Sequence, residues 1–272
     1  MRKRSNVFYR VISSFRISKR QSFVLSAIFL TVGMMVTQGI DSQWRYASVF
    51  VLSSLAAILS AFVLREDLDG IEWLTLLILP SLFTAGVALF YFLLPVRLLT
   101  RIPIAFLFAL GFYALLLTEN IYNVAAIRTI ALLRAAHTVG FIITTVTAFF
   151  FFDTILTFHL SFFIQGVLIF LLSFLLSFQA LWSMVLTTGM EERLVFFSFA
   201  FALIFGEIAM FLAFWPVTSL AGALFLTTIF YVLVGMGQRY LDQRLFNKEI
   251  FEFIIVGVSM FFLMFFSTKW GG

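Results

Sequence analysis

The sequence contains no cysteine, and only 11% of its 272 residues are charged. The lack of cysteine excludes disulfides, thiolate metal sites and cysteine nucleophiles. Soluble domains carry about 25% charged residues, so this chain has too little polar surface to cover a water-soluble globule of its length. Its only histidines are His137 and His159, too few for an expected haem or transition-metal centre. We therefore predict no metal and no cofactor.

Apolar residues are abundant instead: they make up 62% of the chain, with 39 phenylalanines and a mean hydropathy of +1.10. A helix needs roughly 20 apolar residues to cross a hydrocarbon core of about 30 Å. The sequence predicts an all-α polytopic transmembrane bundle of about nine spans, with eight as the alternative. The predicted spans are 22–39, 47–64, 72–95, 102–118, 139–157, 161–187, 194–215, 217–236 and 250–267.

Two pairs of spans need a turn inside a long apolar run. As a single helix, residues 139–187 would measure about 70 Å, which is more than twice the thickness of the hydrocarbon core. We expect the chain to turn within 152–162. The pair Trp215-Pro216 is expected to separate the next two spans, because proline starts a helix readily and tryptophan suits the membrane interface.

The formal charge of +5 is distributed as in membrane proteins. Basic residues lie in the amino-terminal tail and in short loops, which does not favour a nucleic-acid partner. With nine spans and the N-terminus inside, the inner segments hold 14 of the 18 lysines and arginines. These inner segments are 1–21, 65–71, 119–138, 188–193 and 237–249. The sequence thus predicts a multi-pass protein of the cytoplasmic (inner) membrane, N-in and C-out.

The chain divides into a tail, 1–21, and one membrane-embedded domain, 22–272. The tail is basic, and its apolar residues share one helical stripe: Val7, Phe8, Val11, Ile12 and Phe15. This pattern predicts an amphipathic helix on the anionic inner leaflet. The alternative is a frayed basic tail that only sets the orientation.

The stretch 118–140, "TENIYNVAAIRTIALLRAAHTVG", is the least apolar part of the membrane domain. Placed on one helix, several of its polar residues fall within an arc of about 60°. We expect an interfacial connector helix, 119–138, with this arc toward water or a protein crevice. The candidate inner-face polar cluster is Glu119, Asn120, Asn123, Arg134 and His137. The alternative is an amphipathic connector whose charged side chains snorkel to the surface.

Two acids lie inside predicted spans. Glu207 and Asp153 each follow the start of their own span by a similar number of residues, so we expect them at comparable depth near the midplane. A charge at the centre of a spanning helix costs about 2.5–3.5 kcal/mol on insertion scales. Glu207 and Asp153 are therefore a candidate intramembrane polar site for a proton or a cationic substrate. The alternative roles are a helix–helix hydrogen bond for Glu207 and a helix-end cap for Asp153.

The polar stretch, the segment "TAFFFFDTI" and the segment "FWPVTSLAGALFL" (214–226) resemble an uncharacterised family of bacterial multi-span membrane proteins, known only as a domain of unknown function. The resemblance covers roughly residues 90–265. It implies a bacterial origin. It supplies no activity, cofactor or catalytic residue.

Three functions agree with the sequence. The favoured one is a non-enzymatic membrane component that packs with lipid, with another membrane protein or with a second copy of itself. The first alternative is a secondary transporter or permease that uses Glu207. The second is a lipid-acting membrane enzyme that uses the candidate inner-face polar cluster. Enzymatic activity is the less expected outcome, because no catalytic motif that we considered is complete.

Overall fold

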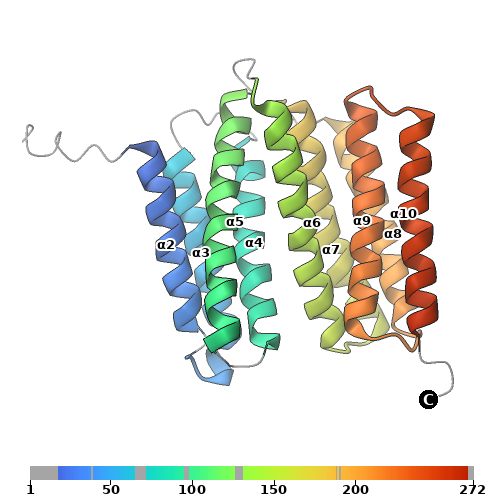
Figure 1. Cartoon of the computed structure of the whole chain (residues 1–272), viewed down its shortest axis with the longest axis horizontal. Helices are drawn as coiled ribbons and strands as arrows, with labels where there is room; N and C mark the ends of the chain where they lie inside the picture. The colour runs from blue at the N-terminus through green and yellow to red at the C-terminus, as the bar shows by residue number, and fades with distance from the viewer. Residues whose placement is uncertain are drawn as a thin grey trace, which may run out of the picture.

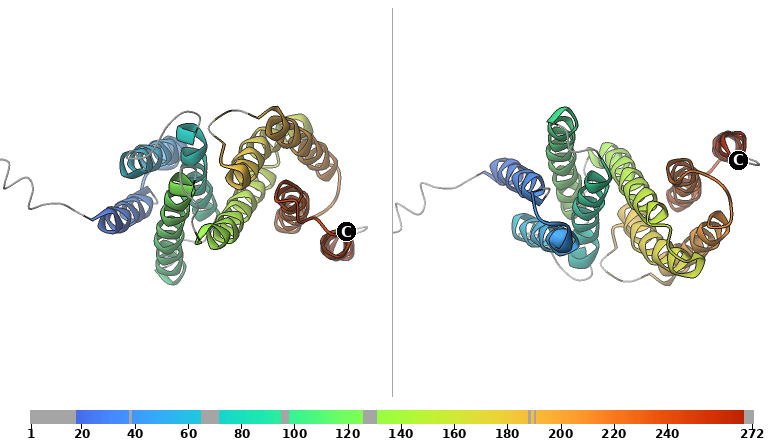
Figure 2. Two further views of the ribbon diagram at one scale, coloured as in Figure 1. Left: turned by 90° about the horizontal axis from the view of Figure 1, so that it is seen from above. Right: turned by 90° about the horizontal axis from the view of Figure 1, so that it is seen from below.

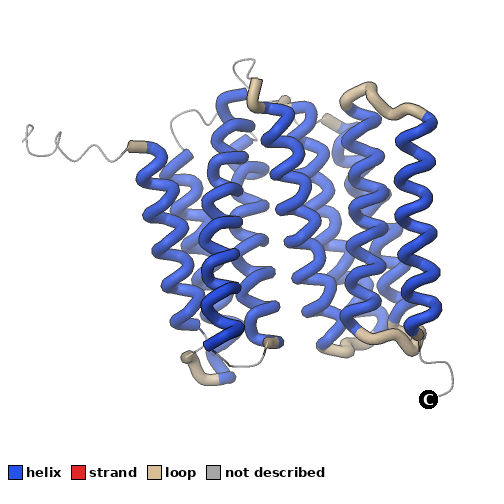
Figure 3. The backbone as a smooth tube through the Cα atoms, viewed as in Figure 1, coloured by secondary structure: helices blue, strands red, loops and turns tan. Residues whose placement is uncertain are grey.

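The structure, a computed structural model, describes residues 18–37, 39–64, 72–94, 98–125, 131–187, 189 and 191–268. Within these residues the chain forms long helices, one short 3-10 helix and no strand (Figure 3). The helices are α2 (Lys19–Thr37), η1 (Ser42–Trp44), α3 (Arg45–Leu64), α4 (Glu72–Leu93), α5 (Leu98–Ala125), α6 (Leu133–Thr157), α7 (Phe162–Val185), α8 (Glu192–Leu212), α9 (Ser219–Leu241) and α10 (Asn247–Ser267).

Nine helices in the described part of the chain are long and apolar enough to cross a membrane. The all-α fold with nine spans is therefore confirmed. Helix is the expected state in hydrocarbon, because only a helix or a closed barrel satisfies every backbone N–H and C=O group there. A buried threonine hydroxyl can also find its hydrogen-bond partner within its own helix. The Thr147 hydroxyl, for example, donates to the Ile143 carbonyl one turn earlier at 2.7 Å.

The expected turns lie where the sequence indicated them. α6 ends at Thr157 and α7 begins at Phe162, so the long apolar run folds back within 152–162. The chain also leaves helix around Trp215-Pro216, between α8 and α9. The expectation that this proline starts the next helix is wrong. α9 begins at Ser219, and the Thr218 side chain caps it by accepting from the Ala221 N–H at 3.3 Å.

The helices stand side by side, with α2 and α3 at one edge and α9 and α10 at the other (Figure 1). Views along the helices show that α4, α5, α6 and α7 occupy the middle (Figure 2). One apolar core runs through the bundle and takes buried side chains from every span. Examples are Leu30, Ala56, Phe112, Phe152, Phe205 and Phe230.

The outer surface is apolar as well, which a water-soluble protein of this size would not tolerate. Phe50 of α3 is 74% exposed, and Phe266 in the last turn of α10 is 79% exposed. α10 packs on α9, and Met264 is its only buried residue. Hydrocarbon is the solvent that matches such a surface.

The predicted tail helix falls on residues 1–17, which lie outside the described residues. The described chain starts at Ser18, and α2 follows at once. The tail's contact with the inner leaflet stays a prediction.

Candidate functional site

The polar stretch 118–140 does not form the predicted connector helix. α5 continues to Ala125, and α6 begins at Leu133 and packs back against α5. The prediction of one helix over 119–138 is therefore wrong. The polar residues of this stretch lie on two helices and do not share one helical face. The first half of the stretch is instead the last part of a 28-residue span, α5. Its polar side chains can enter the bundle because α3 and α7 offer them hydrogen-bond partners.

Glu119 is the central residue of this region. Its side chain is completely buried, and its Oε1 atom accepts a hydrogen bond from the Gln179 Nε2 atom of α7 at 3.1 Å. The Oε1 atom of Gln179 lies 3.4 Å from the Thr144 hydroxyl of α6. The other carboxyl oxygen, Glu119 Oε2, is buried and has no hydrogen-bond partner among the described residues. A buried oxygen without a donor costs free energy, about 1–3 kcal/mol for a neutral group and more for a charged one.

Asn123 lies one turn further along α5 and is also completely buried. Its Nδ2 atom donates to the Leu64 carbonyl at 3.0 Å, and Leu64 is the last residue of α3. The amide therefore satisfies one of the carbonyls that a helix leaves free at its C-terminus. The Asn123 Oδ1 atom has no partner among the described residues, and the same holds for Oδ1 of the half-buried Asn120.

Helices α5 and α6 meet at Tyr122. Its hydroxyl donates to the Ala136 carbonyl of α6 at 2.9 Å, and its ring lies against His137, with ring centroids 5.7 Å apart. Gly140 makes this contact possible, because a Cβ atom there would collide with the Tyr122 hydroxyl. We name Glu119, Tyr122, Asn123, His137 and Gln179 the buried polar cluster.

The structure separates the members of the candidate inner-face polar cluster. It places Glu119 and Asn123 inside the bundle and His137 at its margin, half-buried. Arg134 is exposed on the first turn of α6. Among the described residues, Glu119 forms no ion pair, although His137 lies at the margin of the same buried polar cluster. Among these residues no three His, Cys, Asp or Glu side chains gather as metal ligands.

Sequence reasoning missed the glutamines that join the helices. Besides Gln179, the Gln165 Nε2 atom of α7 donates to the Ala209 carbonyl of α8 at 2.7 Å. Gln238 Nε2 of α9 donates to the Ala180 carbonyl of α7 at 2.8 Å. All three side chains are buried. The sequence signal for such a residue is a glutamine within an apolar segment. This signal predicts that the amide makes a hydrogen bond inside the bundle, but it does not identify the partner.

The candidate intramembrane polar site has its two acids on different helices and in different surroundings. Asp153 is buried in α6, four residues before its end, whereas Glu207 is exposed on α8, five residues before its end. Asp153 lies nearer the C-terminal end of α6 than its middle, and Glu207 lies halfway between the middle and the C-terminal end of α8. Neither makes a hydrogen bond or ion pair with the side chains that the structure describes.

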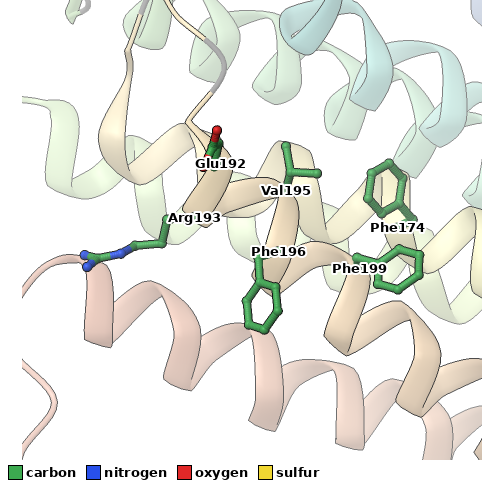
Figure 4. A pocket seen from close by; sticks show the side chains of 6 residues that line it. All are labelled: Phe174, Glu192, Arg193, Val195, Phe196 and Phe199. Carbon is green, nitrogen blue, oxygen red and sulfur yellow. The ribbon is translucent and has the colours of Figure 1, made fainter.

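Three of the surface pockets lie among the described residues. The first, of about 810 Å³, lies on α7 and α8 and is lined by Phe174, Glu192, Arg193, Val195, Phe196 and Phe199 (Figure 4). A smaller one of about 160 Å³ lies near the α6–α7 and α8–α9 connections. A third, of about 300 Å³, lies between the start of α8 and the end of α9 and shares Arg193 with the first. Neither Glu119 nor Glu207 lines any of the three.

Comparison with known proteins gives one match. Neither the curated proteins nor the solved structures contain a protein that matches this chain. A family model with the description "Protein of unknown function (DUF5656)" matches residues 25–267, which include all nine spans except the first turns of α2. The chain therefore belongs to this uncharacterised family.

Proposed function

We propose that the protein is a non-enzymatic component of a membrane assembly and packs against another membrane protein through α8. The contact surface is the Glu207 face, which we define as Leu203, Glu207 and Phe211. These residues are spaced by four, so they share one side of the helix, and all three are exposed.

The observation that supports this proposal is the exposed carboxylate of Glu207 on an otherwise apolar face. Leu203 is 43% exposed and Phe211 is 57% exposed on either side of it. An acid that faces hydrocarbon costs about 2.5–3.5 kcal/mol at the centre of a span and less toward its ends. A neighbouring helix that donates a hydrogen bond or supplies a positive charge removes this cost. No side chain among the described residues supplies such a neighbour, and we assign this role to another chain.

The chemistry of the face indicates the kind of partner. A helix that presents lysine, arginine or a hydrogen-bond donor at the depth of Glu207 would complement it, with small or apolar residues against Leu203 and Phe211. A second copy of this chain fits less well, because a symmetric contact would bring two Glu207 carboxylates together. We therefore assign the face to a different membrane protein.

Photo-cross-linking in native membranes tests this assignment. A photoreactive amino acid at Leu203 or Phe211 should give one discrete product with a protein of a mass different from this chain. Glu207→Leu should reduce that product by about fivefold, because one interhelical hydrogen bond in a membrane is worth up to about 1 kcal/mol.

Glu252→Leu is the matched control, because Glu252 is also exposed but lies on α10. It should leave the cross-linked product unchanged. Cross-links to lipid alone, a product with the mass of two copies, or a product unaffected by Glu207→Leu would each contradict the proposal.

A secondary transporter is the second candidate, and the carboxyl of Glu119 is the observation that favours it. This acid is buried between α5 and α7 and keeps one oxygen free among the described residues. Proton flux into proteoliposomes with an entrapped pH-sensitive dye tests the candidate. Flux that disappears in Glu119→Gln or Glu207→Gln would support it, and flux no different from empty liposomes would exclude it.

The lipid-acting enzyme is the weakest of the three functions, because Arg134 is exposed while Glu119 and Asn123 are buried. For the cellular location we propose the cytoplasmic membrane of a bacterium, with the N-terminus inside. The distribution of lysine and arginine supports this orientation. The basic tail then faces the anionic inner leaflet.

A further inference from the structure

The pocket of about 810 Å³ on α7 and α8 has a polar end and an apolar end. Glu192 and Arg193 lie on the first turn of α8 and point in different directions, while the phenylalanines lie further along the helices (Figure 4). Phe196 and Phe199 follow Arg193 by three and six residues, which places them about 5–9 Å deeper along the helix axis. Such a gradient from charge to aromatic surface matches the boundary between lipid headgroups and acyl chains.

The two phenylalanines of α8 at the apolar end are held by neighbouring rings. The Phe199 ring packs edge-on against the Phe170 ring of α7, with centroids 5.5 Å apart. The Phe196 ring meets the Phe197 ring edge-on, with centroids 6.1 Å apart. Phe196 is nevertheless 69% exposed and Phe199 is 48% exposed, so both present apolar surface to whatever fills the pocket. An acyl chain is the apolar group that the surrounding membrane supplies.

The polar end carries one acid and one base. Arg193 lines this pocket and also the neighbouring one, which it shares with Tyr240 and Gln243. Glu192 and Arg193 also lie at the N-terminus of α8, where the helix dipole carries a partial positive charge that favours a phosphate. Arginine binds phosphate well, and a carboxylate binds an ammonium group.

We propose that this pocket binds one phospholipid whose headgroup carries a primary ammonium, with the phosphate at Arg193, the ammonium at Glu192 and an acyl chain along Phe196 and Phe199. The balance of charge selects a zwitterionic lipid rather than an anionic one. The site differs in residues and ligand from the Glu207 face.

Native mass spectrometry of the delipidated full chain tests the site, with phosphatidylethanolamine, phosphatidylcholine and phosphatidylglycerol added in turn. One phosphatidylethanolamine should bind most tightly. Phosphatidylcholine, which lacks N–H donors, and anionic phosphatidylglycerol should bind about tenfold more weakly, since a hydrogen bond to a charged group is worth about 1.5–3 kcal/mol. Glu192→Gln should remove the preference for phosphatidylethanolamine, and Arg193→Gln should weaken all three lipids.

Arg244→Gln and Glu252→Gln are the controls, because these residues are exposed and line neither pocket. Both should bind lipid like the wild type. Thermal unfolding without added lipid shows whether each variant is folded. Equal binding of the three headgroups, a preference for phosphatidylglycerol, or binding unchanged in Glu192→Gln and Arg193→Gln would overturn the proposal.

Discussion

At the scale of residues, Gln179 shows how this bundle holds polar groups in an apolar interior. Its amide N–H donates to Glu119 of α5, and its carbonyl oxygen lies near the Thr144 hydroxyl of α6. An amide that both donates and accepts can join two helices without a charge of its own. Gln165 and Gln238 join α7 to α8 and α9 to α7 by donating from Nε2 to a backbone carbonyl. Among the described residues, α7 is therefore tied to its neighbours by side-chain amides and by no ion pair.

We predict that Gln179→Leu destabilises the protein by about 1–3 kcal/mol, because Glu119 then loses the donor to Oε1 while its other oxygen already has none in the described structure. Glu119→Gln should be as stable as the wild type or more stable, since the new amide oxygen still accepts from Gln179 and a neutral amide costs less to bury than a carboxylate with an unpartnered oxygen. Unfolding in mild detergent measures both. A Gln179→Leu variant with wild-type stability would contradict this account of the buried polar cluster.

At the scale of elements, the backbones of α7 and α8 approach each other closely at a pair of glycines, Gly166 and Gly206. A Cβ atom on Gly206 would lie 3.2 Å from the Gly166 carbonyl oxygen and 3.2 Å from the Phe170 Cβ atom. Small residues at such a contact allow two helix backbones to approach, which is how membrane helices gain packing energy. The nearby bond from Gln165 to the Ala209 carbonyl fixes the same pair of helices.

Gly206→Ala should destabilise the protein by about 1–3 kcal/mol, because the atoms it meets belong to or adjoin the backbone and have no freedom to rotate away. Gly257→Ala on α10 is the matched control: its nearest neighbour would be the Val232 Cγ2 atom at an ordinary 3.7 Å. That variant should be neutral or slightly stabilising, since alanine favours helix over glycine. Equal thermal stability of the two variants would contradict the proposed role of Gly206.

The sequence predicts the spans well and their contacts poorly, for a physical reason. A span is a local property, an apolar run measured against the thickness of the bilayer. The contact of Glu119 with Gln179 depends on how α5 lies against α7, which no local pattern contains. The division of this stretch between α5 and α6 is not predicted by the sequence, because residues 119–138 contain neither glycine nor proline to mark a helix end. The exposure of Glu207 likewise depends on which side of α8 meets α7.

At the scale of the whole molecule, an odd number of spans is the property on which the orientation and the proposed sites depend. With nine spans the two ends of the chain lie on opposite sides of the membrane. The start of α8, with Glu192 and Arg193, then lies on the same side as the N-terminus, as does the α9–α10 connection (Figure 1). Glu207 lies closer to the opposite side.

Labelling of single cysteines in intact cells with a membrane-impermeant maleimide tests this topology most directly, because the native chain has no cysteine to interfere. Gly39→Cys, Ser161→Cys and Ser267→Cys, all exposed at one end of the bundle, should react from outside. Ser18→Cys, Gly189→Cys and Asn247→Cys, exposed at the other end, should react only after the cells are opened. Reaction of Ser18→Cys and Ser267→Cys from the same side would contradict the nine-span account.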